Sequence, residues 1–219
     1  MATTARSSTS KKKAPSRSSA GAAGAAKNGT AKNGTVKRGI AKAGTARSRG
    51  ETDTYTIPGM SEADAGVTAE ILQRRLEALI DLTLTLKHVH WNVVGNGFIG
   101  VHEMLDPQYQ AVALMVDTTA ERIATMGVSP NGLAGSLVAH RDWEDYPLGR
   151  DVVPQHLLEL DAAYSGVIGD HRAALDRLGE LDPVTEDMII GQLAALEGFQ
   201  WFIRAHLENR DGVMAKSLR

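Results

Sequence analysis

The sequence changes in character near residue 50, and this change limits which part of the chain can fold. Residues 1–50 contain 12 basic side chains and no Asp or Glu. Residues 51–219 hold the other 12 of the 24 basic side chains and all 26 acidic ones, so they carry a formal charge of −14. The formal net charge of −2 is therefore the sum of a basic and an acidic segment. Such asymmetry indicates an anionic partner for the basic segment.

A five-residue repeat with a lysine in each unit occupies residues 26–45, which read AKNGT AKNGT VKRGI AKAGT. Gly and Asn at this density oppose helix formation, and apolar side chains are too few to offset the entropy of ordering the chain. We therefore expect a disordered basic tail at residues 1–53, a folded domain at 54–210 and a short C-terminal tail at 211–219.

The basic tail suits double-stranded DNA, because each cation placed on a phosphate releases counterions without requiring a fixed structure. No aromatic residue precedes Tyr55, so bases cannot stack on the tail and binding should not depend on base sequence. The candidate DNA-binding residues are Lys11, Lys12, Lys13, Arg17, Lys27, Lys32, Lys37, Arg38, Lys42, Arg47 and Arg49. Other interpretations stay open: a solvated tail, a tail folded back on the acidic body, or a transit peptide, which the frequent glycines disfavour.

Composition excludes several classes of protein. The chain has no cysteine, which rules out disulfide scaffolds, thiolate zinc sites and cysteine nucleophiles. No apolar run approaches the roughly 20 residues of a membrane span. The basic start is not followed by the apolar segment of a secretory signal. We therefore expect no membrane partner.

Apolar residues recur at helical spacing from Ser61 onward, with no convincing strand alternation. The pattern predicts an all-α antiparallel four-helix bundle with a short extra helix in the long connection between the second and third helices. Pro107 lies inside the second helix and predicts a bend next to Asp106. The predicted helices cover residues 61–94, 99–126, 136–141, 150–178 and 183–209.

Five possible metal ligands lie on the first two predicted helices. His90 is 18 residues, or five whole turns, after Leu72 and so shares the apolar face of the first helix. A lone histidine on such a face is more often a hydrogen-bonded core residue, and a polar face is ordinary on a surface helix. On the second helix, four residues fall within about 100° of one another on the helical wheel: His102, Asp106, Asp117 and Glu121.

The axial spacing of these residues is more informative than their shared face. The first pair, His102 and Asp106, lies about 22 Å along the helix from the second, Asp117 and Glu121. One metal cluster cannot touch both pairs within one chain. An antiparallel copy of the helix, related by a two-fold axis near residues 111 and 112, would bring each pair opposite the other pair of its mate. A short turn would add His90, and these nitrogen and oxygen ligands suit iron, manganese or zinc, with a carboxylate-rich shell favouring iron.

Three motifs resemble the ferroxidase signature of the Dps family (DNA-binding proteins from starved cells). They are His90-Trp91-Asn92, FIGVHEMLD at 98–106 and DTTAER at 117–122. The five ligand types match the family's spacings of 12, 4, 11 and 4 residues, and FQWFI at 199–203 resembles the family's last helix. The resemblance covers about residues 54–210. The segments TIPG at 56–59 and KHVHW at 87–91 look actinobacterial.

The resemblance implies a ferritin-like bundle that assembles into a hollow dodecameric shell in the bacterial cytoplasm, associated with the nucleoid. Such shells bind two Fe per inter-subunit site, oxidise Fe²⁺ with hydrogen peroxide, store the ferric mineral and protect DNA. Carried over residue by residue, one chain would supply His90, His102 and Asp106, and its two-fold mate would supply Asp117 and Glu121.

Two further assignments follow from the same resemblance. Trp91 would lie near the site and supply an electron, or else pack in an interface. The acidic residues Asp182, Glu186 and Asp187 resemble the lining of an iron-entry pore. The helix dipole also explains acidic residues at a helix start.

Two competing functions remain. One is a structural protein that compacts the nucleoid and whose metal site is vestigial or occupied by zinc. The other is an ordinary ferritin, which the ligand layout disfavours because the folded region contains no Glu-x-x-His.

Removal of residues 1–50 should abolish DNA binding and leave iron oxidation unchanged, because the remaining chain carries a formal charge of −14 and repels phosphate. Binding by the full-length protein should weaken steeply with salt. A plasmid mobility-shift assay at several salt concentrations measures both effects. A truncated protein that still shifts plasmid at the same concentration would contradict the assignment of the tail.

Overall fold

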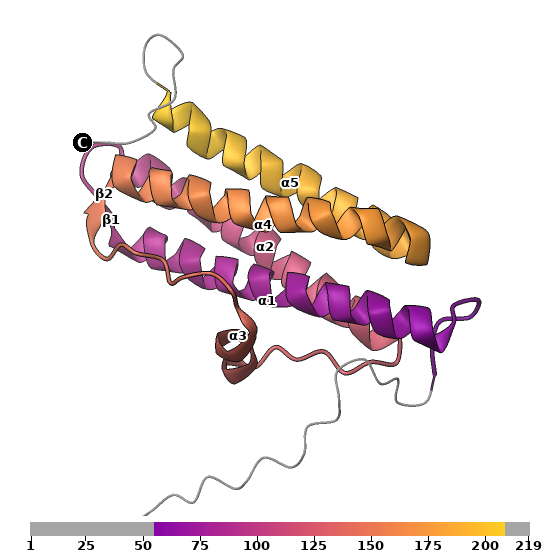
Figure 1. The fold of residues 1–219 in the computed structure, drawn as a ribbon. Helices are drawn as coiled ribbons and strands as arrows, with labels where there is room; N and C mark the ends of the chain where they lie inside the picture. The colour runs from indigo at the N-terminus through magenta and orange to yellow at the C-terminus, as the bar shows by residue number, and fades with distance from the viewer. Residues whose placement is uncertain (1–54, 209–219) are drawn as a thin grey trace, which may run out of the picture. The chain divides into compact units, whose positions relative to one another are not determined.

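Four long helices form the folded region: α1 (Glu62–Asn92), α2 (Phe98–Thr125), α4 (Val153–Leu181) and α5 (Pro183–Leu207). A computed structural model describes them, together with the rest of residues 55–208. A short helix, α3 (Ala134–His140), lies in the long connection between α2 and α4 (Figure 1). The predicted four-helix bundle with an extra helix is therefore confirmed. The expected tails at 1–53 and 211–219 lie outside the described residues.

The helix ends follow from local chemistry. The Ser61 side chain caps α1 by accepting a hydrogen bond of 3.1 Å from the backbone N–H of Asp64. Gly95 and Gly97 both have positive φ, 89° and 77°, and they turn the chain from α1 into α2. That short turn holds the end of α1 beside the start of α2.

The helices form a ring in the order α1, α2, α5, α4, since each neighbouring pair in this order is in contact (Figure 1). Their apolar faces meet inside the ring. Leu72, Leu76, Leu79 and Leu86 of α1 are at most 1% exposed, as the periodicity of the sequence predicted. Buried leucines of this kind contribute about 1.5–3 kcal/mol each to folding. No helix among residues 55–208 is long and apolar enough to cross a membrane.

The structure departs from the sequence prediction at one end of the bundle. Two short strands, β1 (Val93–Val94) and β2 (Asp151–Val152), pair in parallel, whereas no strand was predicted. Two residues are too few to show the alternation by which a strand is recognised. The pairing also moves the start of α4 from the predicted residue 150 to Val153. It ties the connection before α4 to the end of α1.

The second helix runs without interruption through Pro107. A proline costs one backbone hydrogen bond at this point, and the buried side chains on both sides, Leu105 and Val112, hold the helix against its neighbours. The bend expected next to Asp106 stays a prediction.

Gly127→Ala should lower the stability of the protein by about 2 kcal/mol, or about 4–8 °C in the thermal midpoint. Gly127 has a φ of 78°, and a Cβ there would lie 1.9 Å from the carbonyl oxygen of Tyr55. Gly169→Ala is the matched control, because nothing lies within 4 Å of a Cβ at that helical position. Equal midpoints for the two variants would contradict the close contact at Gly127.

Candidate metal centre

Two histidines from adjacent helices stack at the turn between α1 and α2. The rings of His90 and His102 lie with centroids 3.6 Å apart and planes 23° apart. The Nδ1 of His90 lies 3.0 Å from the backbone oxygen of His102. The Nδ1 of His102 lies 2.9 Å from the backbone oxygen of His90. Each ring is thus fixed by the main chain of the other residue.

This reciprocal arrangement determines which nitrogen of each neutral ring carries the proton. A carbonyl oxygen only accepts hydrogen bonds, so each Nδ1 carries its proton and donates it. In the neutral imidazole the other nitrogen, Nε2, then holds a lone pair. A ring oriented in this way by a backbone oxygen is prepared for metal ligation through Nε2.

Asp106 lies one turn after His102 on α2, next to the two histidines. Its Oδ1 is 3.4 Å from the Nδ1 of His90, and its side chain is 46% exposed. The same Oδ1 accepts a hydrogen bond of 2.7 Å from the ammonium group of Lys87. That hydrogen bond is the main cause that lowers the pKa of Asp106, so the carboxylate is ionised at neutral pH.

Lys87 was not among the residues singled out from the sequence. Its ammonium lies on Asp106 and 4.7 Å from the centre of the Tyr109 ring, so it would compete with a metal cation for that carboxylate. Its position one turn before His90 was the available signal, because residues three apart share a helix face.

Asp117 and Glu121 lie elsewhere on α2 and are both exposed. Asp117 is about 16 Å along the helix from Asp106. Within residues 55–208 of one chain, no group of three or more His, Asp or Glu side chains is arranged to hold a metal ion. The structure thus brings together three of the five predicted ligands and leaves two apart.

The two separate carboxylates belong to an exposed stripe along α2. Successive residues of the stripe are alternately four and three positions apart in the sequence, and one of them, Leu114, is 63% exposed. A stripe with this spacing matches the contact face of paired helices. Residue numbers in the stripe are symmetric about position 112. The stripe consists of Glu103, Pro107, Gln110, Leu114, Asp117 and Glu121.

Trp91 follows His90 at the end of α1 and is 74% exposed. Such exposure of a large aromatic side chain is compatible with both roles considered for it, an interface contact and electron donation. The predicted DNA-binding residues of the tail lie outside the described residues.

The three residues assigned to a pore differ in their surroundings. Asp182 caps α5, accepting from the backbone N–H of Thr185 at 3.2 Å, and it also binds the guanidinium of Arg122. Burial opposes ionisation of Asp182, but the hydrogen bonds from Thr185 and Arg122 outweigh it and lower its pKa. Glu186 is half-buried and Asp187 is exposed. A structural role thus accounts for Asp182, whereas Asp187 is available to solvent cations.

Lys87→Met should tighten binding of a divalent cation about two- to five-fold, because it removes the ammonium that competes for Asp106. Lys87→Arg is the matched control, since it keeps the positive charge at that position. Calorimetric titration with Fe²⁺ under anaerobic conditions measures both variants. Weaker binding by Lys87→Met would mean that the lysine orients Asp106 for the metal instead of competing with it.

Comparison with known proteins identifies the family of the chain. A family model described as a ferritin-like domain matches residues 69–213. The "DNA protection during starvation protein" of Mycolicibacterium smegmatis is 52% identical over 159 residues, which is 73% of this chain and 87% of that protein. The "Fine tangled pili major subunit" of Haemophilus ducreyi is 51% identical over 158 residues, 72% of this chain and 84% of that protein. The solved structure of DpsA14 from Streptomyces coelicolor is 54% identical, covers 75% of this chain and 98% of its own, and superposes with a TM-score of 0.73. The chain therefore belongs to the Dps family of ferritin-like proteins.

Proposed function

We propose that this protein is a ferroxidase that oxidises Fe²⁺ with hydrogen peroxide at sites shared between two chains, stores the ferric product and protects DNA. The single observation that carries the proposal is the reciprocal pair His90 and His102, in which each Nδ1 is held by a backbone oxygen and Nε2 is left for a ligand, with the Asp106 carboxylate 3.4 Å from the Nδ1 of His90. Nitrogen and carboxylate ligands without a thiolate suit iron.

The symmetry of the α2 stripe supports the sharing of sites. In an antiparallel pair of α2 helices centred on position 112, Leu114 packs against the partner's Gln110. Pro107, next to Asp106, faces the partner's Asp117. Each end of the pair then gathers two imidazoles and a carboxylate from one chain with two carboxylates from the other. A two-fold axis repeats this group once more.

The chemistry requires two electrons for each peroxide. Two ferrous ions supply them together: 2 Fe²⁺ + H₂O₂ + 2 H⁺ → 2 Fe³⁺ + 2 H₂O. Delivery of both electrons avoids release of hydroxyl radical. The backbone oxygens orient the two imidazoles through Nδ1, and the hydrogen bond from Lys87 lowers the pKa of Asp106 and so keeps it ionised. Iron enters as Lys87 leaves Asp106.

The acidic region beyond residue 50 attracts Fe²⁺, and the basic tail binds DNA without sequence preference. We expect homo-oligomeric assembly, with twelve chains forming a shell. In such a shell the acidic region would attract Fe²⁺ and the basic tails would bind DNA, so the two activities would use different parts of each chain. The function in the cell is thus iron storage beside the nucleoid.

The double variant His102→Ala/Asp106→Ala should oxidise iron at least about 10- to 100-fold more slowly than the natural protein. Absorbance of ferric product after addition of Fe²⁺ and peroxide measures the rate. The matched control is Asp176→Ala/His206→Ala, which removes the same two residue types from exposed positions on α4 and α5. Equal rates in the double variant and the natural protein would overturn the ferroxidase proposal.

Mixed assemblies test the sharing of the site separately. His102→Ala and Asp117→Ala chains, each inactive alone, should regain about a quarter of the activity when assembled together. With random pairing, half of the dimers contain both variants, and one of their two sites is then intact. Sites contained within single chains would show no recovery.

A second function is favoured by the ion pair between Lys87 and Asp106, because a lysine on that carboxylate suits a site without iron. In that case the protein compacts DNA and its metal site is vestigial or holds zinc. Slow iron oxidation by the natural protein, together with intact DNA binding, would support this second function.

A further inference from the structure

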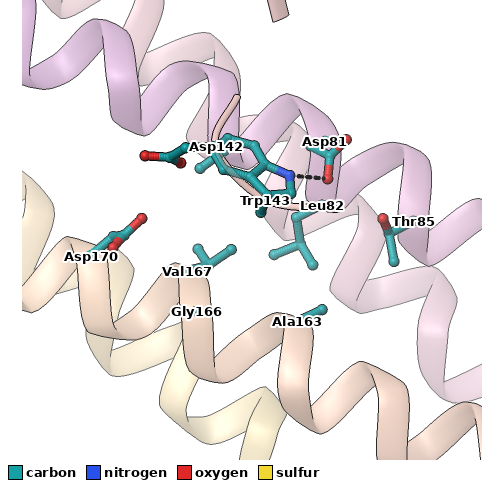
Figure 2. A pocket seen from close by; sticks show the side chains of 10 residues that line it. Asp81, Leu82, Thr85, Asp142, Trp143, Ala163, Gly166, Val167 and Asp170 are labelled. Carbon is teal, nitrogen blue, oxygen red and sulfur yellow. Dashed lines mark hydrogen bonds between the residues drawn. The ribbon is translucent and has the colours of Figure 1, made fainter. Parts of the chain in front are cut away.

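A cavity of ≈250 Å³ opens between α1 and α4, beside the connection that follows α3. Figure 2 shows the indole of Trp143 on the side of the cavity opposite Val167 and Gly166 of α4, with Leu82 of α1 beside it. Small residues provide the space, since a Cβ added at Gly166 would meet nothing within 4 Å. The walls are mainly apolar, and the cavity contains none of the five predicted metal ligands.

The position of Trp143 is fixed by a hydrogen bond. Its Nε1 donates to the Asp81 carboxylate at 2.9 Å, drawn as a dashed line in Figure 2. The neighbouring Arg141 also holds this segment, at 3.7 Å from Asp81. The indole thus forms one wall of the cavity.

The rim of the cavity is acidic. Three carboxylates and no basic side chain line it: Asp81, Asp142 and Asp170. Three guanidinium groups approach from outside the lining: Arg74 at 3.4 Å from Asp142, Arg75 at 3.3 Å from Asp170, and Arg141.

Those arginines are shared with further carboxylates. Arg74 also pairs with Glu77, and Arg141 also pairs with Asp145 and feels the charge of Glu144. Six carboxylates therefore surround three guanidinium groups. Each lining carboxylate is thus paired with one guanidinium, and the negative excess lies just outside the lining, on Glu77, Glu144 and Asp145.

We infer that this cavity binds a small organic cation with one flat apolar ring and one ammonium group, such as an arylalkylamine. The size suits a single ring, because a cavity of about 150 Å³ takes benzene and drug-sized sites begin near 300 Å³. The apolar walls and the indole favour the ring. The acidic rim favours the ammonium over a carboxylate.

The site stays accessible in the proposed pairing of chains. It lies on the α1–α4 side of the helical ring, opposite the α2–α5 side (Figure 1). The exposed stripe of α2 through which the chains would pair contains none of the residues that line the cavity. The inference does not depend on the ferroxidase proposal.

Calorimetric titration of the full-length protein with phenethylamine tests the inference. We expect saturable binding, and binding of phenylacetate, which has the same ring and the opposite charge, about five-fold weaker or more. Asp81→Asn keeps the acceptor for Trp143 and removes the charge, and it should weaken phenethylamine binding about two- to five-fold.

Filling the cavity provides the matched comparison. Gly166→Leu should lose saturable binding of phenethylamine, whereas Gly169→Leu, on the same helix and outside the lining, should keep it. Ala163→Leu fills the same space from the adjacent turn and replaces Gly166→Leu if that variant does not assemble.

Three results would overturn the inference: no saturable binding to the natural protein, unchanged binding in the filled variants, or equal affinity for phenylacetate. The comparison of the two ligands on the natural protein decides the outcome even when both filled variants fail to assemble.

Discussion

The candidate metal centre depends on hydrogen bonds that the end of α1 and the start of α2 exchange. The last carbonyl groups of α1 have no partner within their own helix, and the His90 carbonyl is one of them. His102 supplies the missing donor through Nδ1, and His90 returns a hydrogen bond to the backbone of His102. The turn with two positive-φ glycines makes this exchange possible. Both imidazoles therefore serve the fold with one nitrogen and keep the other free for chemistry.

Helical periodicity predicted the long helices because each buries a continuous apolar face, as α1 does with Leu72 and Leu76. It missed the pairing of β1 with β2, since two residues carry no pattern. For the site, spacing alone placed His90 beside His102. The ammonium of Lys87 on Asp106 depends on side-chain conformations, which spacing does not specify. Asp182 caps α5 and also binds Arg122. The sequence did not reveal the second contact, because Arg122 lies about 60 positions away in the chain.

The relatives show how far the bundle alone specifies a role. Two proteins of about 50% identity carry the different names of a DNA protection protein and a pilus subunit. The ferritin-like match begins at residue 69, well after the lysine repeat. The candidate metal ligands lie inside this match, whereas the lysine repeat, the candidate for association with DNA, lies outside it. Fold and partner are therefore separate properties of this chain.

The symmetric stripe of α2 restricts how this sequence can change in length. One residue inserted between Asp106 and Asp117 would turn the following half of the helix by about 100° and shift it by about 1.5 Å. Because the mate would carry the same insertion, both ends of an antiparallel pair would lose their alignment together. The connection around α3 has no such symmetry to keep. Insertions and deletions should thus accumulate in that connection and remain absent from the centre of α2.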